Sequence, residues 1–367
     1  MLYQRKYLRY LFVMFAFLGI ILMLTGIYQT VSAQENRDDN AFVGISTCLS
    51  EPFDYLGEEQ RKGYELAIQR INEEGGVLGQ EIEFEVRDTN VNPLKTMENA
   101  LDFINEHEAD LITGGLTSHV ALAQSSIAKE EKVLFLAGLT HSAAITGFDH
   151  READYGEQVA NRYTFRWFLN AMMTQNALNP YLEEKFGAGN NYYYITADYE
   201  WGDSLEHAIQ HATESAGSDT AGSIRTDLGQ EDFSKEVETA QEADPDILVL
   251  VLTGTDLIHA LRDLHETGFD DIPVVVPAIG ERLLDPLSPE KTADIISTIN
   301  WTWSLQDRYP GSEEFVDAYM QQYGEPPPVQ AAIGWVNVHE WASAVERAGT
   351  FDTSAVIEEL EGHTFKL

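Results

Sequence analysis

Two short stretches in the first half of the chain combine glycine, hydroxyl side chains and histidine. The first follows the apolar run 110–113 and reads Gly-Gly-Leu-Thr-Ser-His over 114–119. The second follows the apolar run 133–137 and reads Gly-Leu-Thr-His-Ser over 138–142. A strand, a tight turn and a helix N-terminus would leave N–H groups and the positive end of the helix dipole beside these hydroxyls. We expect a cradle for a small molecule at the rim of a sheet, with ordinary helix capping as the alternative.

The sequence contains no recognisable catalytic or metal-binding pattern. Ser118 stands in Gly-Leu-Thr-Ser-His, which is not the G-x-S-x-G turn of a serine hydrolase. His207 and His211 have helical i, i+4 spacing, but no third ligand accompanies them. His339 begins an H-E-x-x-H pattern that has no second histidine. We therefore predict no catalytic residues, no metal and no cofactor, and regard an α/β enzyme as the least favoured class.

The composition is strongly acidic. The chain has 61 Asp and Glu against 23 Lys and Arg, a formal net charge of −38. Such a charge argues against nucleic acids and anionic membrane surfaces as partners. A saline habitat is one hypothesis, because salt screens the repulsion and the acidic surface keeps the protein in solution. Cys48 is the single cysteine, so no intrachain disulfide is possible.

The N-terminus has the pattern of an export signal. Arg5, Lys6 and Arg9 precede the uncharged apolar run 10–28, and Val-Ser-Ala follows at 31–33. This pattern predicts a signal peptide over 1–33 with cleavage after Ala33, and hence a periplasmic or extracytoplasmic protein. The apolar run is close to the ~20 residues that span a bilayer, so an uncleaved N-terminal anchor is the alternative.

In the exported part, segments with the hydrophobic pattern of strands alternate with segments that have the pattern of helices. Apolar or alternating runs predict strands, and apolar residues at i, i+3, i+4 and i+7 predict helices between them. This order predicts an α/β fold with two doubly wound parallel-sheet lobes and a cleft between them. The chain stops just after a strand-like start at 363–366, from which we expect a missing C-terminal piece. The predicted strands are 41–47, 81–87, 110–113, 133–137, 163–167, 192–196, 223–226, 247–252, 273–278 and 295–303, and the later helices include 168–186, 232–241, 311–323 and 331–348.

Residues 56–85, LGEEQRKGYELAIQRINEEGGVLGQEIEFE, closely resemble the first helix, glycine turn and strand of a known family. This family is the branched-chain amino-acid type of periplasmic solute-binding proteins of ABC transporters, which have the type I periplasmic-binding-protein fold. The resemblance continues through nearly the whole exported part. Its further matches are Asp88 with Pro93, Gly114-Gly115 with Thr117-Ser118, Phe165-Arg166, 198–202, 232–234, Pro245-Asp246, Phe315 with Tyr319 and Tyr323-Gly324, and 348–350.

The resemblance implies an architecture and a role. Lobe 1 would comprise 41–165, lobe 2 would comprise 166–304, and 305–362 would return to lobe 1. The lobes would close on a hinge around an amino acid or a related small carboxylate or amide, which a monomer would deliver to an ABC permease in the inner membrane. A membrane-anchored ligand-sensing receptor or regulator domain of the same fold is the alternative.

The resemblance also implies which residues form the ligand site. Thr117 and Ser118 match the positions that grip a ligand carboxylate, and Trp201 matches an aromatic residue that covers the ligand. His119 and His141 depart from the small hydroxyl residues of the family, which leaves room for a bulkier, aromatic or more acidic solute. The ligand-binding residues that we predict are Thr117, Ser118, Leu139, Thr140, His141, Tyr199, Trp201, Thr253, Glu281 and Tyr55.

Overall fold

The computed structural model describes residues 40–147, 161–269 and 271–365. The predicted signal sequence lies outside these residues. In the part that is described, no helix is both long enough and apolar enough to cross a membrane.

The first half of the chain builds a five-stranded parallel sheet in the order β2-β1-β3-β4-β5. Its strands are β1 (Ala41–Thr47), β2 (Ile82–Asp88), β3 (Leu111–Gly114), β4 (Leu134–Ala137) and β5 (Thr164–Arg166). The helices between them are α2 (Asp54–Glu73), α3 (Pro93–His107) and α4 (Ser118–Glu131). Three helices from the end of the chain join this half, namely α9 (Pro310–Tyr323), α10 (Val329–Ala348) and α11 (Thr353–Leu360). We call this assembly the first lobe.

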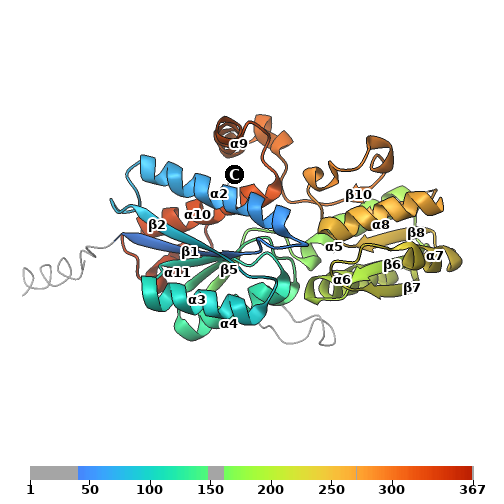
Figure 1. Cartoon of the computed structure of the whole chain (residues 1–367), viewed down its shortest axis with the longest axis horizontal. Coiled ribbons are helices and arrows are strands. Elements are labelled where there is room, and N and C mark those ends of the chain that lie inside the picture. The colour runs from blue at the N-terminus through green and yellow to red at the C-terminus, as the bar shows by residue number, and fades with distance from the viewer. Residues whose placement is uncertain (1–39, 148–160, 270, 366–367) are drawn as a thin grey trace, which may run out of the picture. The chain divides into compact units, whose positions relative to one another are not determined.

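Helices cover both faces of the first sheet. Apolar residues of α2, α9 and α10 pack in one core cluster with Val43, Leu111 and Leu134 of the strands. Residues of α3 and α4 pack in a second cluster with Ile112 and Phe135, which alternate with the first set along β3 and β4. The two sets of helices therefore lie on opposite faces of the sheet (Figure 1). Apolar residues fill both faces of such strands, as parallel strands between two helix layers require.

The second sheet is also parallel and has the order β10-β9-β8-β6-β7. Its strands are β6 (Asn191–Ala197), β7 (Asp219–Thr226), β8 (Ile247–Val251), β9 (Val274–Val276) and β10 (Ile296–Ser297). Helices α7 (Ser234–Glu242) and α8 (Gly254–Thr267) pack on one face, and α5 (Ala171–Phe186) and α6 (Glu200–Ser215) pack on the other. We call this assembly the second lobe.

Both sheets have the same winding. In the first sheet the chain order reverses between β1 and β3, and in the second it reverses between β6 and β8. A ligand of an open parallel sheet binds beyond the carboxyl ends of the strands at such a reversal. The fold class predicted from the sequence is confirmed, while the lobe boundaries remain predictions.

Near the end of the chain, one predicted strand is shorter in the structure and one helix was not predicted. The expected strand 295–303 is only the two-residue strand β10, which pairs with β9 at the edge of the second sheet. The chain then leaves this sheet, because Trp301 is buried in the core of the first lobe and donates its indole N–H to Ser312 Oγ at 2.8 Å. The sequence analysis also did not predict helix α11, which the structure forms over Thr353–Leu360.

A candidate ligand pocket between the two lobes

A pocket lies between the carboxyl ends of the two sheets. Its first-lobe residues follow β1, β3, β4 and β5 or begin α10, and its second-lobe residues follow β6, β8, β9 and β10. These are the places where doubly wound sheets hold ligands. The lining residues are Phe53, Leu56, Leu116, Thr117, Ser118, Leu139, His141, Phe168, Tyr199, Trp201, Thr253, Ala278, Ile279, Gly280, Leu283, Ile299, Val329 and Gln330.

Helix N-termini from both lobes meet at this pocket. Helices α4, α6 and α8 begin directly after Thr117, Tyr199 and Thr253, and none of these three residues makes a side-chain capping hydrogen bond. The first turns of α6 and α8 carry acidic residues, whereas the first turn of α4 has none. The partial positive charge of a helix N-terminus is therefore least compensated at α4.

Two glycines shape the turn that leads into α4. Gly114 has a φ of +110° and Gly115 a φ of +70°, a region that residues with a Cβ rarely adopt. A Cβ on Gly114 would lie 2.1 Å from the carbonyl oxygen of Ser46, so the backbones of β3 and β1 approach too closely for any side chain. The sequence Gly114-Gly115 therefore places the start of α4 next to the end of β1.

The loop after β4 is fixed to the same helix start. Ser118 Oγ accepts hydrogen bonds from the backbone N–H groups of His141, at 3.4 Å, and of Ser142, at 3.1 Å. Behind the loop, Arg166 donates to the carbonyls of Thr140, at 3.2 Å, and of Ser142, at 2.8 Å. The two hydroxyl-containing stretches singled out in the sequence thus form one connected structure, in which Ser118 is the link.

Asn337 of α10 ties the strands behind these turns together. This buried side chain donates from Nδ2 to the carbonyls of Leu136 and Ala137, each at 3.2 Å, and approaches Thr113 Oγ1 at 3.2 Å. Helix α10 therefore positions the ends of β3 and β4, from which the pocket loops start.

Three buried polar atoms of pocket residues make no hydrogen bond within the described part of the chain. They are Thr117 Oγ1, His141 Nδ1 and Gln330 Oε1. The side chains are 3 %, 1 % and 4 % exposed, so bulk water does not substitute for a partner. A buried polar atom without a partner is unfavourable, and a bound ligand or ordered water would supply the missing bonds.

Aromatic rings form much of the remaining pocket wall. Tyr199 and Trp201 stack with their ring centroids 5.8 Å apart, and both come from the start of α6. From the first lobe, Phe53 lies 6.4 Å from the Tyr199 ring, and His141 presents an edge to Trp201 at 6.5 Å. Aromatic rings of the two lobes therefore contact each other around the pocket.

The buried imidazole of His141 is electrically neutral at physiological pH. Burial, with the nearby positive charge of Arg166, lowers the pKa of His141 to about 3. Its Nε2 lies 2.8 Å from the hydroxyl of Thr174 on α5, so Nδ1 is the nitrogen available to the pocket. His141 can offer a ligand one hydrogen-bond donor or acceptor, but no charge.

Direct hydrogen bonds also join the two lobes beside the pocket. Ser142 Oγ donates to Glu200 Oε1 at 2.6 Å, and the N–H of Ala143 donates to Ser204 Oγ at 3.1 Å. Both second-lobe partners lie on α6, the helix that carries Trp201. The loop after β4 therefore contacts the pocket and the opposite lobe at once.

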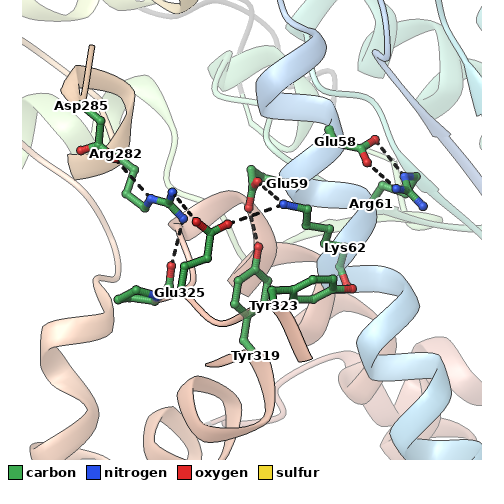
Figure 2. Close-up of polar contacts among 10 residues, drawn as sticks. Glu58, Glu59, Arg61, Lys62, Arg282, Asp285, Tyr319, Tyr323 and Glu325 are labelled. Atoms are coloured by element: carbon green, nitrogen blue, oxygen red, sulfur yellow. Dashed lines mark hydrogen bonds and ion pairs between the residues drawn. The ribbon is translucent and has the colours of Figure 1, made fainter. Parts of the chain in front are cut away.

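An ionic network joins other segments near the pocket (Figure 2). Arg282, two residues after the pocket residue Gly280, pairs with Glu325 at 2.8 Å and donates to the carbonyl of Pro326 at 3.2 Å. Glu325 in turn lies 3.7 Å from Lys62 of α2, which pairs with Glu59 at 2.6 Å. The network thus ties the segment after β9 in the second lobe to the link between α9 and α10 in the first.

Seven of the ten predicted ligand-binding residues line the pocket. Thr140 is buried beside it but does not line it. Tyr55 is 37 % exposed and lines a separate groove with Gly254 and Ile258. Glu281 begins a 3-10 helix directly after Gly280, and its side chain lies outside what the structure describes. The seven lining residues are Thr117, Ser118, Leu139, His141, Tyr199, Trp201 and Thr253.

Sequence analysis missed several pocket residues. Phe53 lies in the same loop as Tyr55, and the choice between two aromatic residues there depends on which one turns inward. Gln330 occupies the first turn of α10, where the preceding run Pro326-Pro327-Pro328 marks a helix start. Phe168 follows β5 without any distinguishing local pattern.

The described residues contain no group of three or more His, Cys, Asp or Glu side chains that could hold a metal ion. The lining residues of the pocket offer hydrogen bonds, aromatic stacking and apolar contacts to a ligand. Two parallel-sheet lobes with a lined pocket between their helix N-termini define a two-lobed ligand-binding protein.

Comparison with known proteins gives the family. The model of the periplasmic binding protein family matches residues 41–367, and the chain belongs to this family. A relative from Brucella melitensis, the Leu/Ile/Val-binding protein homolog 7, is 27 % identical over 323 residues, which are 85 % of this chain and 78 % of the relative. Family membership implies a solute-binding role and an extracytoplasmic location.

Solved structures agree in fold. A periplasmic binding protein from Burkholderia mallei superimposes with a TM-score of 0.80 at 22 % identity, covering 89 % of this chain and 83 % of that one. A solute-binding protein of an ABC transporter from Rhodopseudomonas palustris, solved with 3,4-dihydroxybenzoic acid, has a TM-score of 0.76 at 18 % identity and covers 89 % and 86 %. At these identities the likeness concerns the fold alone.

Proposed function

We propose that this protein is the substrate-binding protein of an ABC importer and captures an amino acid or a related small carboxylate or amide between its two lobes. The observation that carries the proposal is the pocket itself. The start of α4, with Thr117 and Ser118, faces Trp201 and Tyr199 of the opposite lobe across it. A carboxylate suits the helix N-terminus, and an apolar or aromatic group suits the rings.

Capture works by a shift between open and closed forms. A ligand held at the start of α4 reaches the wall of the second lobe only when the lobes are together, so it binds the closed form better. The Ser142–Glu200 and Ala143–Ser204 hydrogen bonds belong to that closed arrangement. The hinge would be formed by the crossings near Phe165, near Ser304 and close to the C-terminus, which bound the lobes 41–165 with 305–362 and 166–304.

The proposed function also implies a partner protein, the permease, and an extracytoplasmic location. A monomer in the periplasm or an equivalent extracytoplasmic space would present its closed form to a permease in the inner membrane. The predicted signal peptide over 1–33 fits this route of export. No catalytic residue is assigned, because the polar groups of the pocket suit binding.

The proposed site includes residues at different distances from the ligand. The seven pocket-lining residues would touch it directly. Thr140 would act by holding the loop after β4. Glu281 would pair with a ligand ammonium group, and Tyr55 would act at the entrance, where its groove adjoins Leu283.

A thermal-shift screen of amino acids, small amides and aromatic acids tests the proposal, because a ligand that binds only the folded state raises the melting temperature. The double variant Ser118→Ala/Trp201→Ala should lose the shift given by the best compound. The control Ser215→Ala/Tyr181→Ala changes a surface serine and an exposed aromatic ring, and should keep it. A shift that survives in the pocket variant would place the site elsewhere.

The sensor alternative depends on the long apolar run 10–28, which could remain as an anchor. N-terminal sequencing of the protein from its own cells separates the two roles. A mature chain that begins at Gln34 supports the importer, and an intact N-terminus supports a tethered receptor of the same fold.

A further inference from the structure

One side chain of the ionic network beside the pocket reaches from the second lobe to the first (Figure 2). Arg282 belongs to the second lobe, since it lies in the 3-10 helix Glu281–Leu284 after β9, and its neighbour Leu283 is part of the core cluster of β8 and α8 residues. Its guanidinium bonds to the first lobe, where it pairs with Glu325 at 2.8 Å and donates to the carbonyl of Pro326 at 3.2 Å. Arg282 therefore joins the lobes through its side chain.

Glu325 stands on a short link that the first lobe holds at both ends. It follows Gly324, which ends α9 with a φ of +77°, and the prolines 326–328 lead directly from it into α10. Proline restricts φ, so this link has few conformations available. Both helices pack in the core of the first lobe. The carboxylate is thus presented at a defined place to a partner on the second lobe.

Further polar residues hold Glu325 from its own lobe. Lys62 of α2 lies 3.7 Å from Glu325 and pairs with Glu59 at 2.6 Å. Glu59 is buried and also accepts a hydrogen bond from the hydroxyl of Tyr319 on α9. Cations and anions therefore alternate along the network. All these residues belong to the first lobe, so separation of the lobes breaks only the contacts that Arg282 makes with them.

The Arg282–Glu325 pair lies beside the pocket without lining it. Gly280 and Val329, which are close to the pair in sequence, do line the pocket. A Cβ on Gly280 would lie 3.3 Å from a methyl carbon of Val329, so the two segments already meet at the pocket wall. Within the second lobe Arg282 has Asp285 as a partner, at 3.4 Å and with a side chain that is 64 % exposed. That pair is the weaker of the two, because it is longer and more exposed to water.

From these contacts we propose that the Arg282–Glu325 pair is a latch between the lobes, which stabilises the closed form without touching the solute. This inference rests on the proposed capture of a solute by lobe closure. Arg282 is a positioning residue, because a larger closed fraction lets a solute that prefers the closed form bind more tightly. The two side chains are 21 % and 37 % exposed, so salt screens the pair and weakens the latch.

Single-molecule fluorescence energy transfer on the protein without added solute measures the latch directly. Dyes are attached at Leu94→Cys, near the start of α3, and at Lys235→Cys, near the start of α7, both exposed positions, while the buried Cys48 stays unlabelled. The strands before these helices, β2 and β7, lie at the sheet edges opposite to β5 and β10, after which the chain crosses between the lobes. The distance between the dyes therefore reports closure.

Arg282→Gln should raise the ratio of open to closed molecules about two- to fivefold, the effect of one partly exposed ion pair. Glu325→Gln should raise it similarly, and the double variant should raise it little further, because both changes remove the same interaction. Arg282→Lys should recover part of the closed fraction, since it keeps the charge. The matched control is Arg61→Gln, which removes ion pairs with Glu58 and Glu65 inside α2 and should leave the ratio unchanged.

Salt provides a second measurement of the same latch. Raising KCl from about 0.05 M to about 1 M should shift the ratio further toward open molecules in the wild type than in Arg282→Gln, which lacks the pair to be screened. Equal shifts in the two proteins would contradict an ionic latch.

An open-to-closed ratio that Arg282→Gln leaves unchanged overturns the latch, as does a wild-type protein with no closed molecules in the absence of solute. A ratio that rises equally in Arg61→Gln also overturns it, since the loss of any ion pair would then suffice. These results leave the solute-binding function standing, because the thermal-shift screen tests that function separately. Conversely, a latch found in a protein that binds no compound of the screen would remove the proposed function and keep the latch.

Discussion

His141 connects the polar and the aromatic parts of the pocket. Its ring lies edge-on to Phe168 at 5.9 Å and to Trp201 at 6.5 Å, and its Nε2 bonds to Thr174. A charged imidazole in this position would be desolvated beside Arg166, so the folded protein keeps the neutral form. The residue thus links ligand recognition to the stability of the protein in mild acid.

We predict a loss of stability below about pH 6.5 that depends on His141. The folded pKa of about 3 lies below the ordinary value of 6.5, so the unfolded chain takes up the proton first and stability falls as the pH falls through this window. One such group contributes a slope of about 1 kcal/mol per pH unit. Urea unfolding at several pH values from about 7 to 5.5, above most carboxylate titrations, measures this slope.

The variant His141→Gln should have a shallower slope in this window than the wild type. Met173→Gln, which changes an exposed residue of α5 that does not titrate, is the control and should keep the wild-type slope. Equal slopes for all three proteins would mean that His141 is not the buried neutral group described above.

Individual pocket residues were predictable where the backbone required a particular residue type. Thr117 and Ser118 follow two glycines that the turn after β3 needs, so local sequence marks them. Trp201, in the first turn of α6, was predicted from the family resemblance instead. Gln330 and Phe168 enter the pocket through tertiary packing of α10 and of the segment after β5. Such packing joins residues far apart in the chain and leaves no local pattern.

At the scale of elements, the close approach of β3 and β1 determines where α4 begins. The carbonyl of Ser46 accepts from the N–H of Gly115 at 2.7 Å, and the carbonyl of Gly114 accepts from the N–H of Gly138 at 2.7 Å. The turn at Gly114 is therefore bonded to the strands on both sides, and a displacement there would move the whole first-lobe side of the pocket.

Gly114→Ala tests this close approach, with Gly75→Ala as a matched control. Both glycines have a φ of +110°, but an added Cβ at Gly75 meets nothing within 4 Å, whereas at Gly114 it meets Ser46 O at 2.1 Å. Gly75→Ala should lower the free energy of unfolding by about 1 kcal/mol through backbone strain. Gly114→Ala should lower it by at least about 2 kcal/mol more, because of the added clash. Equal losses in urea titrations would contradict the packing described for this turn.

The bounds of helices and strands with a regular hydrophobic pattern were predictable to within a few residues. The segment in which the chain passes from the second lobe back to the first was not predictable. The apolar run that forms β8 and the amphipathic repeat that forms α8 each satisfy a local rule. By contrast, the run 295–303 has strand-like residues, but Trp301 leaves the second sheet for the core of the first lobe. Its destination depends on Phe315 and Ser312, which a local window does not include.

For the whole molecule, the net charge of −38 acts on stability as well as on solubility. Much of the acidic surface faces water, and ion pairs such as those of Arg61 and Arg282 offset only part of the repulsion. Salt screens repulsion between like charges over distances beyond about 10 Å at 0.1 M. Folding should therefore be favoured by salt even though the ion pairs themselves are weakened.

We predict that the melting temperature rises by several degrees between about 0.05 M and 2 M KCl. Differential scanning calorimetry measures the shift, and an uncharged osmolyte at the same osmolality controls for effects other than screening. A melting temperature that stays constant or falls with KCl would remove the hypothesis of adaptation to a saline habitat.

The central claim is that one small solute is held by both lobes at once. A calorimetric double-mutant cycle with Ser118→Ala in the first lobe and Trp201→Ala in the second tests this claim with the best compound of the screen. We predict one ligand per chain, a loss of at least about 1 kcal/mol for each variant, and a coupling between the two losses of at least about 0.5 kcal/mol. Unchanged affinity in either single variant would contradict binding between the lobes.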